Sequence, residues 1–319
     1  MLDVRRIRLL RDLSVHGTVT ATAEAACLSG PAVSQQLAAL EKEAGVPLLE
    51  KQGRVLRLTA AGRLLVEHAE VILGSLAAAE ADLLALRADG GGRSLVRIAA
   101  FPSAARVLLP LLWRELAAGS AEAPAPAQAP APRLHLTEAE PDRAVQALRH
   151  GDADLAVVHA YSLLPRDLPP GCEQHRLLDD PVLLAVPAGA ADRLRLSPGQ
   201  AADLRRLAGE DWLLPGPETS CHELAQRACG AAGFVPRKVA LASDFSVLTA
   251  LVGAGAGVAL VPRLALPADT TGVSLHPLTE PVTRTVSALT RTGEARQPQL
   301  KRVVELLHTV SARHRHPGE

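Results

Sequence analysis

The sequence is short of aromatic side chains, with three Phe, two Trp and one Tyr among 319 residues. Because 48% of the residues are still hydrophobic, the chain can bury cores built from Leu, Val, Ile and Ala, which excludes a wholly disordered protein. Four irregularly spaced Cys argue against a disulfide framework. No apolar run is long enough to span a membrane, and Arg5-Arg6-Ile7-Arg8 follows Met1 without the apolar segment of a secretory signal. We therefore expect a cytoplasmic protein without a membrane partner.

An excess of charge of either sign is also missing, since 34 Lys and Arg balance 34 Asp and Glu. The balance hides an uneven distribution. Residues 1–63 hold nine Arg or Lys against six Asp or Glu, whereas residues 64–88 hold one Arg against four acidic residues. Positive charge is thus concentrated in the N-terminal segment, which is where we expect a nucleic-acid surface.

Low-complexity segments divide the chain. Residues 88–92, Ala-Asp-Gly-Gly-Gly, are typical of a hinge, and residues 117–132 form a Pro/Ala tract that cannot pack a core. Before the hinge the periodicity is helical except over residues 46–58. After it, strand patterns alternate with helical ones, which favours a parallel α/β sheet. We expect strands at 96–100, 133–137, 155–159, 182–186, 212–214, 258–261 and 285–289. We expect helices at 104–116, 141–150, 198–206, 221–232, 245–252 and 298–313.

The N-terminal segment has the pattern of three short helices. The apolar spacing predicts helices over residues 3–16, 19–27 and 31–44. Leu28-Ser29-Gly30 is predicted to be a tight turn, with Pro31 in the first turn of the third helix. Residues 46–58 then form a wing with a basic edge. A winged helix-turn-helix is the arrangement that this order predicts.

The third helix has two different faces. Val33, Leu37 and Leu40 share the face that should be buried, while small and amide side chains lie opposite. Gln can make bidentate contacts to adenine in the major groove, and basic side chains of a wing suit phosphates or the minor groove. The residues that we expect against DNA are Ser29, Pro31, Ala32, Ser34, Gln35, Gln36, Ala38, Lys51 and Arg54. A helix-turn-helix used for protein contacts is the alternative, but it would not need the basic wing.

The same segment resembles the signature of LysR-type transcriptional regulators. The resemblance rests on Leu28 to Leu37, Leu40-Glu41, Gly45-Val46, Leu48 to Lys51 and Leu58 to Gly62, which are collinear with few gaps. Gly30 departs from a usual Gln, Gln35 from a common Arg, Leu49 from a common Phe and Lys51 from a common Arg. The first two departures fall at expected base contacts, so the family's DNA sequence preference does not carry over.

A heptad pattern follows the wing. The apolar residues Leu65, Ala69, Ile72, Leu76, Ala79, Leu83 and Leu86 alternate spacings of four and three, which indicates a two-helix seam. The helix would be about 40 Å long, more than a small domain can cover, so we expect it to pair two chains. An ordinary intramolecular helix is the alternative. The family resemblance implies a dimer or a dimer of dimers.

The resemblance also implies the fold of the rest of the chain. Residues 1–58 would be the DNA-binding domain, 59–88 a linker and dimerisation helix, and 93–311 an effector-binding domain similar to type 2 periplasmic binding proteins. That last domain would consist of two α/β subdomains, residues 93–163 with 268–311 and residues 164–267, on either side of a cleft. The expected partners are double-stranded promoter DNA and an unidentified small-molecule effector.

Ligands of open α/β sheets bind beyond the carboxyl ends of strands, near helix N-termini. Ser103, Thr219 and Ser220 fall at such places and carry hydroxyls that could hold a carboxylate or phosphate. Plain helix capping explains them equally well. The residues that we expect to line the cleft are Pro102, Ser103, Pro141, His159, Thr219, Ser220 and Phe245.

Cys221 and Cys229 open a different possibility. Peroxide-sensing members of the family carry two redox cysteines in a similar region, and Cys221 at a helix N-terminus would have a lowered pKa. Eight residues apart on one helix, the two are too distant for a disulfide without unfolding. We find no catalytic constellation and no zinc spacing, so we expect neither an enzyme nor a cofactor or metal. A thiol-based sensor, a ligand-independent DNA-binding protein and a solute-binding protein are the alternatives.

Overall fold

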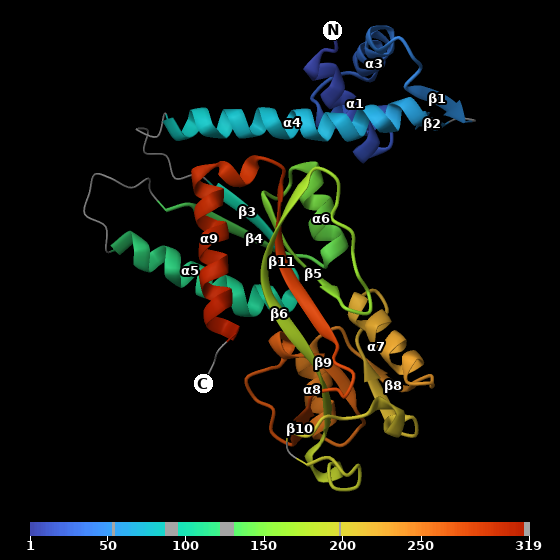
Figure 1. Ribbon diagram of the computed structural model, residues 1–319, viewed down its shortest axis with the longest axis vertical. Coiled ribbons are helices and arrows are strands. Elements are labelled where there is room, and N and C mark those ends of the chain that lie inside the picture. The colour runs from blue at the N-terminus through green and yellow to red at the C-terminus, as the bar shows by residue number, and fades with distance from the viewer. Residues whose placement is uncertain (53–54, 87–94, 122–130, 198, 316–319) are drawn as a thin grey trace.

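The computed structural model describes residues 1–52, 55–86, 95–121, 131–197 and 199–315 (Figure 1). The N-terminal domain consists of three helices and a hairpin, and a long helix leaves it. Their bounds are α1 Val4–His16, α2 Val19–Ala25, α3 Gly30–Ala44, β1 Leu49–Gln52, β2 Val55–Leu58 and α4 Ala60–Leu86. The three predicted N-terminal helices and the wing are confirmed, with ends that differ by one or two residues.

Local hydrogen bonds explain where these helices begin and end. The side chain of Asp3 accepts from the backbone N–H groups of α1, and Ser29 accepts from Ala32 at 3.3 Å at the start of α3. Gly17 and Gly45 end α1 and α3 with φ of 75° and 71°, a left-handed backbone that favours glycine. The apolar faces of the helices then meet in one core.

The wing is fixed to α3 by a carboxylate. Glu41 Oε1 accepts from the backbone N–H groups of Leu48 and Leu49 at 2.8 and 3.0 Å. Leu48 is buried, and its carbonyl lies so close to Gly62 of α4 that a Cβ there would be 2.2 Å from the oxygen. The hydrogen bonds from Glu41 therefore set the position of the wing, and the close contact between Leu48 and Gly62 sets the direction of α4.

The C-terminal domain is built on a mixed sheet in the order β10-β6-β11-β5-β3-β4, with β9 also paired to β6. The strands are β3 Leu95–Ala100, β4 Arg133–Glu138, β5 Leu155–Tyr161, β6 Cys172–Pro187, β9 Ala259–Pro262, β10 Val273–His276 and β11 Thr283–Arg291. Strands β3, β4 and β5 run parallel, but β11 is antiparallel to both β5 and β6. The expectation of a parallel sheet is confirmed for β3, β4 and β5 but not for the other strands, because no helix separates β5 from β6 or β10 from β11.

Strand β6 is much longer than the predicted residues 182–186. Its first part, Cys172 to Pro181, pairs with β11, and its second part, Val182 to Pro187, pairs with β9 and β10. We call the part of the domain around the first segment the first lobe and the part around the second segment the second lobe. The expected boundary at 268 would place β10 in the first subdomain, but its pairing puts it in the second lobe.

Helices cover the first lobe on both faces (Figure 1). Helices α5 Pro102–Ala121 and α9 Pro298–Arg315 pack with Val96, Leu155 and Val286 on one face. Helix α6 Pro141–His150 covers the other face with Ala156 and Leu289. The helix α5 continues into the Pro/Ala tract, most of which lies outside the described residues, as does the hinge at 89–92.

The second lobe holds the parallel pair β7 Asp211–Leu214 and β8 Arg237–Leu241 with α7 Ser220–Ala231 and α8 Phe245–Gly253. Trp212 is fully buried in its core. The predicted helix over 198–206 was wrong. Residue 198 lies outside the described residues, Gly199 has φ of 75°, and Ala202 forms a bridge to Leu278, so that only the 3-10 turn η2 Leu204–Leu207 follows. Within the described residues, no helix is long and apolar enough to cross a membrane.

Candidate DNA interface and effector cleft

Helix α3 presents a polar row to solvent. Ser34 and Gln35 are exposed side by side and Ala38 one turn later, with Pro31 at the start and Lys42 at the end of the row, while Val33, Leu37 and Leu40 are buried beneath. An exposed amide beside small side chains is the arrangement that a reading helix needs to approach base edges. The buried and exposed faces lie as the periodicity predicts.

Three of the predicted contact residues have other tasks in the structure. Gln36 is half-buried and its Oε1 accepts from Arg6 Nε at 2.9 Å, so this amide ties α3 to α1. Ser29 caps α3 and Ala32 is half-buried. On the wing, Lys51 and Arg57 are exposed, whereas Arg54 lies outside the described residues.

Only part of the predicted seam of α4 is free to meet another chain. Ala69 is fully buried in the core of the N-terminal domain, and Leu65 packs half-buried against the same core. Ile72, Leu76 and Leu83 are 37%, 39% and 61% exposed. Leu64 and Val71 are also exposed, on the neighbouring side of the helix. The heptad spacing did not distinguish buried from exposed seam positions. Leu65 and Ala69, the first two positions, pack against the N-terminal core to which α1 belongs.

The two lobes meet at a buried polar cluster. His159 Nε2 and Ser220 Oγ are 3.0 Å apart, and Tyr161 Oη and Cys221 Sγ are 2.7 Å apart. Each pair joins the end of β5 in the first lobe to the start of α7 in the second. All of these side chains except Ser220 are buried, so the lobes are in close contact here.

A buried ion pair supports the cluster from the first lobe. Arg284 donates to Asp180 Oδ2 at 2.6 and 2.9 Å and to Ser103 Oγ at 3.1 Å, and its guanidinium lies 5.0 Å from the centre of the Phe101 ring. Arg284 and Asp180 are 1% and 2% exposed. The other Asp180 oxygen accepts from the backbone N–H of Leu264 at 2.8 Å. The charge of each partner is therefore met by hydrogen bonds, as a buried pair requires.

Burial controls the proton affinities in the cluster. The pKa of His159 lies well below its ordinary value because the ring is desolvated, with Arg284 and Arg166 adding repulsion. The Nδ1 atom of this ring has no partner among the described residues. Burial also raises the pKa of Cys221, although Arg284 opposes the shift. The expected lowered pKa of Cys221 was wrong, because desolvation outweighs the helix N-terminus.

The structure brings some of the predicted cleft residues together and separates others. Ser103, His159 and Ser220 belong to the cluster around Phe101, whose ring contacts His159 edge-on at 4.5 Å. Thr219 Oγ1 donates to the Gly216 carbonyl at 2.8 Å and accepts from His222, which is helix capping. Pro102 is exposed, and Phe245 is half-buried against the second-lobe core.

A cavity of about 500 Å³ adjoins the cluster in the first lobe. It lies between α6, β5, β11 and the segment that links β5 to β6, and Pro141 and His159 are among its lining residues. Its polar walls come from Gln146, Arg149, Arg166 and Gln174. A volume of this size suits a small metabolite.

Sequence reasoning missed Tyr161, Asp180, Arg284 and Glu140. Asp180 and Arg284 are 104 positions apart, and no local pattern marks them as partners. Glu140 precedes α6 without capping it, and burial raises the pKa of its carboxyl against the pull of Arg284. The prediction from the sequence looked for hydroxyl groups that could bind an anion, and it therefore did not consider the carboxylates of Asp180 and Glu140.

Both domains of the chain match known protein families. Residues 4–63 match the family model of bacterial regulatory helix-turn-helix proteins of the lysR family, and residues 89–312 match the LysR substrate binding domain. The chain belongs to the LysR family. It is a DNA-binding transcriptional regulator with an α/β effector-binding domain.

Individual relatives cover nearly the whole regulator. The OxyR dual regulator of Escherichia coli K12 is 27% identical over 98% of this chain and 96% of its own. ClcR of Pseudomonas putida is 27% identical over 82% of this chain and 83% of its own. The structure of full-length CbnR complexed with its target DNA is 25% identical, with a TM-score of 0.52, over 97% of this chain and all of the other. A full-length OxyR variant of Pseudomonas aeruginosa, 20% identical over 96% of this chain and 95% of its own, shares the fold with a TM-score of 0.60.

Proposed function

We propose that this regulator recognises promoter DNA through the exposed row of α3, with Gln35 as the principal base contact and Ser34 beside it. The support is the exposure of this row above a fully buried face. Lys51 and Arg57 of the wing supply phosphate contacts, while Gln36 acts indirectly by fixing α3 to α1. Recognition of this kind requires no catalysis and takes place in the cytoplasm.

We infer that two chains pair along the exposed apolar surface of α4. Ile72, Leu76 and Leu83 continue the heptad spacing beyond the core of the N-terminal domain and have water, not protein, on one side. Pairing would remove this surface from water and present two reading helices to two half-sites. The resulting dimer, alone or doubled into a tetramer, is the DNA-binding unit.

We also infer that the effector binds in the first-lobe cavity bounded by Pro141 and His159, next to the contact between the lobes. Support comes from the cluster next to it, where His159 and Ser220 join one lobe to the other. A ligand that moves either residue changes the contact between the lobes. Such a change can bias two arrangements of the regulator on DNA.

The experiment that tests the reading helix is a gel shift on the DNA upstream of the regulator's own gene and on genomic fragments selected by binding, across a salt series. Gln35→Ala should weaken the free energy of specific DNA binding by about 1–3 kcal/mol, while the affinity of the variant still falls with increasing salt. The matched control is Gln226→Ala, an exposed glutamine on α7 of the other domain. Selection that enriches no sequence, or equal losses for the two variants, would refute the assignment.

Thiol-based sensing is the second candidate function, and the contact between Cys221 and Tyr161 beside Arg284 favours it. Burial speaks against it, because it raises the pKa of Cys221 and raises that of Cys229 to about 12. A protonated, buried thiol is a poor nucleophile. The effector-binding proposal is therefore preferred.

A further inference from the structure

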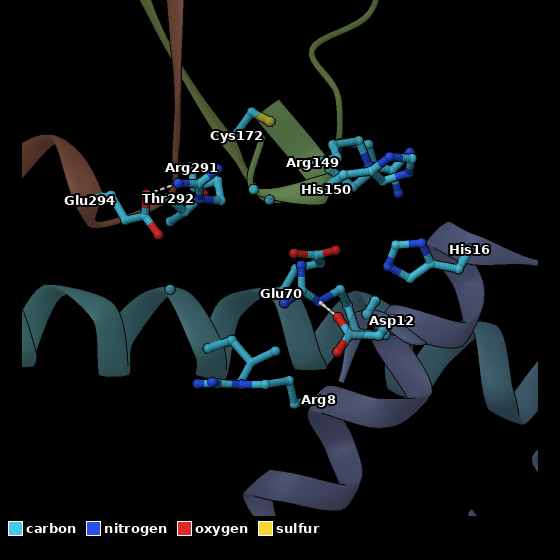
Figure 2. A pocket seen from close by; sticks show the side chains of 17 residues that line it. Arg8, Asp12, His16, Glu70, Arg149, His150, Cys172, Arg291, Thr292 and Glu294 are labelled. Atoms are coloured by element: carbon cyan, nitrogen blue, oxygen red, sulfur yellow. Dashed lines mark hydrogen bonds and ion pairs between the residues drawn. The ribbon is translucent and has the colours of Figure 1, made fainter. Parts of the chain in front are cut away.

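A second cavity, of about 380 Å³, lies between the N-terminal domain and the first lobe (Figure 2). Its lower wall in Figure 2 comes from α1 and α4, and its upper wall from the end of α6, the start of β6 and the turn after β11. Its charged lining residues include Arg8, Arg11, Glu70, Arg149, Arg291 and Glu294. None of these residues belongs to the reading helix or to the cluster between the lobes, but Arg149 also lines the first-lobe cavity.

Two glycines allow the two walls to approach closely, because a side chain at either position would clash with the opposite wall. A Cβ on Gly74 of α4 would lie 2.9 Å from Thr292 Cγ2. Gly171 has φ of 73°, and a Cβ there would be 2.2 Å from Glu70 Oε2. At the far end, the rings of His16 and His150 stack with their centroids 4.8 Å apart. The two domains thus contact each other beside the cavity, which stays partly open to solvent.

The charges of the cavity are incompletely paired. Arg291 binds Glu294 at 2.8 Å and the carbonyls of Leu148 and Ala153, so its charge is satisfied. Among the described residues, no hydrogen bond or ion pair joins Arg8 or Arg149 to a partner.

Arg11 is only partly paired. Its Nε lies 3.1 Å from Asp12 Oδ1 as an ion pair, but this buried nitrogen makes no hydrogen bond in the described structure. Glu70 is the carboxylate left to oppose these arginines. Burial raises its pKa, although Arg11 and Arg149 act to lower it. The cavity therefore has more unpaired cationic groups than anionic ones, and a negative ligand would complete it.

We propose that this cavity binds a small multivalent oxyanion between Arg149 of the C-terminal domain and Arg8 and Arg11 of the N-terminal domain. Guanidinium groups present paired N–H donors that match the oxygens of phosphate, sulfate or a dicarboxylate. Because its ligands come from both domains, the bound anion holds the DNA-reading domain against the sensing domain. Its occupancy is coupled to the position of the reading helix, at a cavity distinct from the proposed effector cavity even though Arg149 lines both.

Isothermal titration of the full-length regulator with sodium phosphate, at constant ionic strength in chloride, tests the proposal without DNA. We expect saturable binding of one anion per chain, and competition by sulfate and by succinate. Arg149→Gln and Arg8→Gln should each weaken phosphate binding about tenfold or more. Circular dichroism of both variants shows whether they are folded, so that a loss in either folded variant is interpretable.

Two control variants separate this site from other basic surfaces. Arg143→Gln removes an exposed arginine of α6 that does not line the cavity, and Arg57→Gln removes one from the DNA-facing wing. Both should leave phosphate binding unchanged. Binding no different from chloride, failure of sulfate to compete, or equal weakening by Arg143→Gln would overturn the proposal. Weakening by Arg57→Gln alone would place the anion on the DNA surface and overturn it too. Because Arg149 also lines the first-lobe cavity, weakening by Arg149→Gln with no effect of Arg8→Gln would place the anion there and likewise overturn the proposal.

Discussion

His159 of β5 meets Ser220 of α7 with Nε2 and Oγ 3.0 Å apart, so one imidazole touches both lobes of the effector-binding domain. The neighbouring pair of Tyr161 and Cys221 repeats the arrangement two residues further along β5. Both contacts are made at the start of α7. On the first-lobe side of this cluster, Arg284 donates a hydrogen bond to Ser103. A ligand at this junction acts on the connection between the lobes directly.

The first prediction concerns pH. His159 is held neutral in the folded chain because burial depresses its pKa below 6.5, so the unfolded chain binds more protons as the pH falls through that value. The free energy of unfolding should therefore fall below pH 6.5, by up to about 1.4 kcal/mol per pH unit from this group. Urea denaturation between pH 5 and 8 should show a shallower decline for His159→Gln. Glu70 and Glu140, whose raised pKa values act in the opposite direction, are present in both proteins and cancel in the comparison. Parallel curves would contradict the assignment.

Ser103→Ala should separate stability and sensing from DNA binding. The variant loses the acceptor of the hydrogen bond from Arg284, which costs about 1–3 kcal/mol because that donor is buried. Promoter affinity in a gel shift should be unchanged, while the response to metabolites that shift the melting temperature of the wild type should weaken. A folded variant that has lost DNA binding would rule out this separation.

Asp180→Asn should be among the most destabilising single changes in the domain. It leaves the guanidinium of Arg284 buried without its counter-charge, for which about 3–5 kcal/mol is typical. Its neighbour provides the control, since Asp179 makes a half-exposed pair with Arg176 and Asp179→Asn should cost less than about 1 kcal/mol. Chemical denaturation measures both. Similar losses for the two variants would show that the Arg284 pair has little special weight.

The four thiols should differ sharply in reactivity. Cys27 is exposed, whereas Cys172, Cys221 and Cys229 are buried, and the pKa of Cys172 is raised to about 11. A colorimetric thiol assay at pH 8 should therefore find one fast group, absent in Cys27→Ser, and three that react only after denaturation. A fast Cys221 would instead favour the redox alternative.

Substitutions at Gly62 and Gly30 test the close contact between the wing and α4. Ala at position 62 would put its Cβ 2.2 Å from the Leu48 carbonyl oxygen, so Gly62→Ala should destabilise the chain by about 1–3 kcal/mol. Gly30→Ala is the matched control, because no atom lies within 4 Å of a Cβ there and Ala favours the helix. The midpoint of thermal unfolding should fall only for the first variant, and an unchanged midpoint for Gly62→Ala would show that the backbone can move.

Local signals in the sequence predicted the N-terminal domain well. Caps such as Ser29 and stops such as Gly17 and Gly45 act within a few residues, and the structure uses each of them. Apolar periodicity likewise predicted α6 with its observed ends and the buried face of α3. These elements depend on neighbours that are close along the chain.

What the sequence did not predict depends on distant contacts. Strand β8 lacks alternation because most of its residues are exposed, and the first part of β6 is polar on one face, so neither has a strong strand pattern. The pairing of Asp180 with Arg284 arises only when β6 and β11 come together. Ala69 fits a dimer seam by spacing, yet the core of its own domain covers it. Spacing alone does not say which surface will occupy an apolar position.

Strand β6 also determines how the lobes can move. It passes without interruption from the first lobe to the second, and at the junction Val182 donates to the Val282 carbonyl at 2.9 Å. A hydrogen-bonded strand does not bend like a flexible linker, but sheets accommodate twists of about 10 to 35° between neighbouring strands. Rearrangement of the lobes should thus be a rotation about the long axis of β6. Because β11 pairs with β6, such a rotation would also move the turn after β11, which lies against α4.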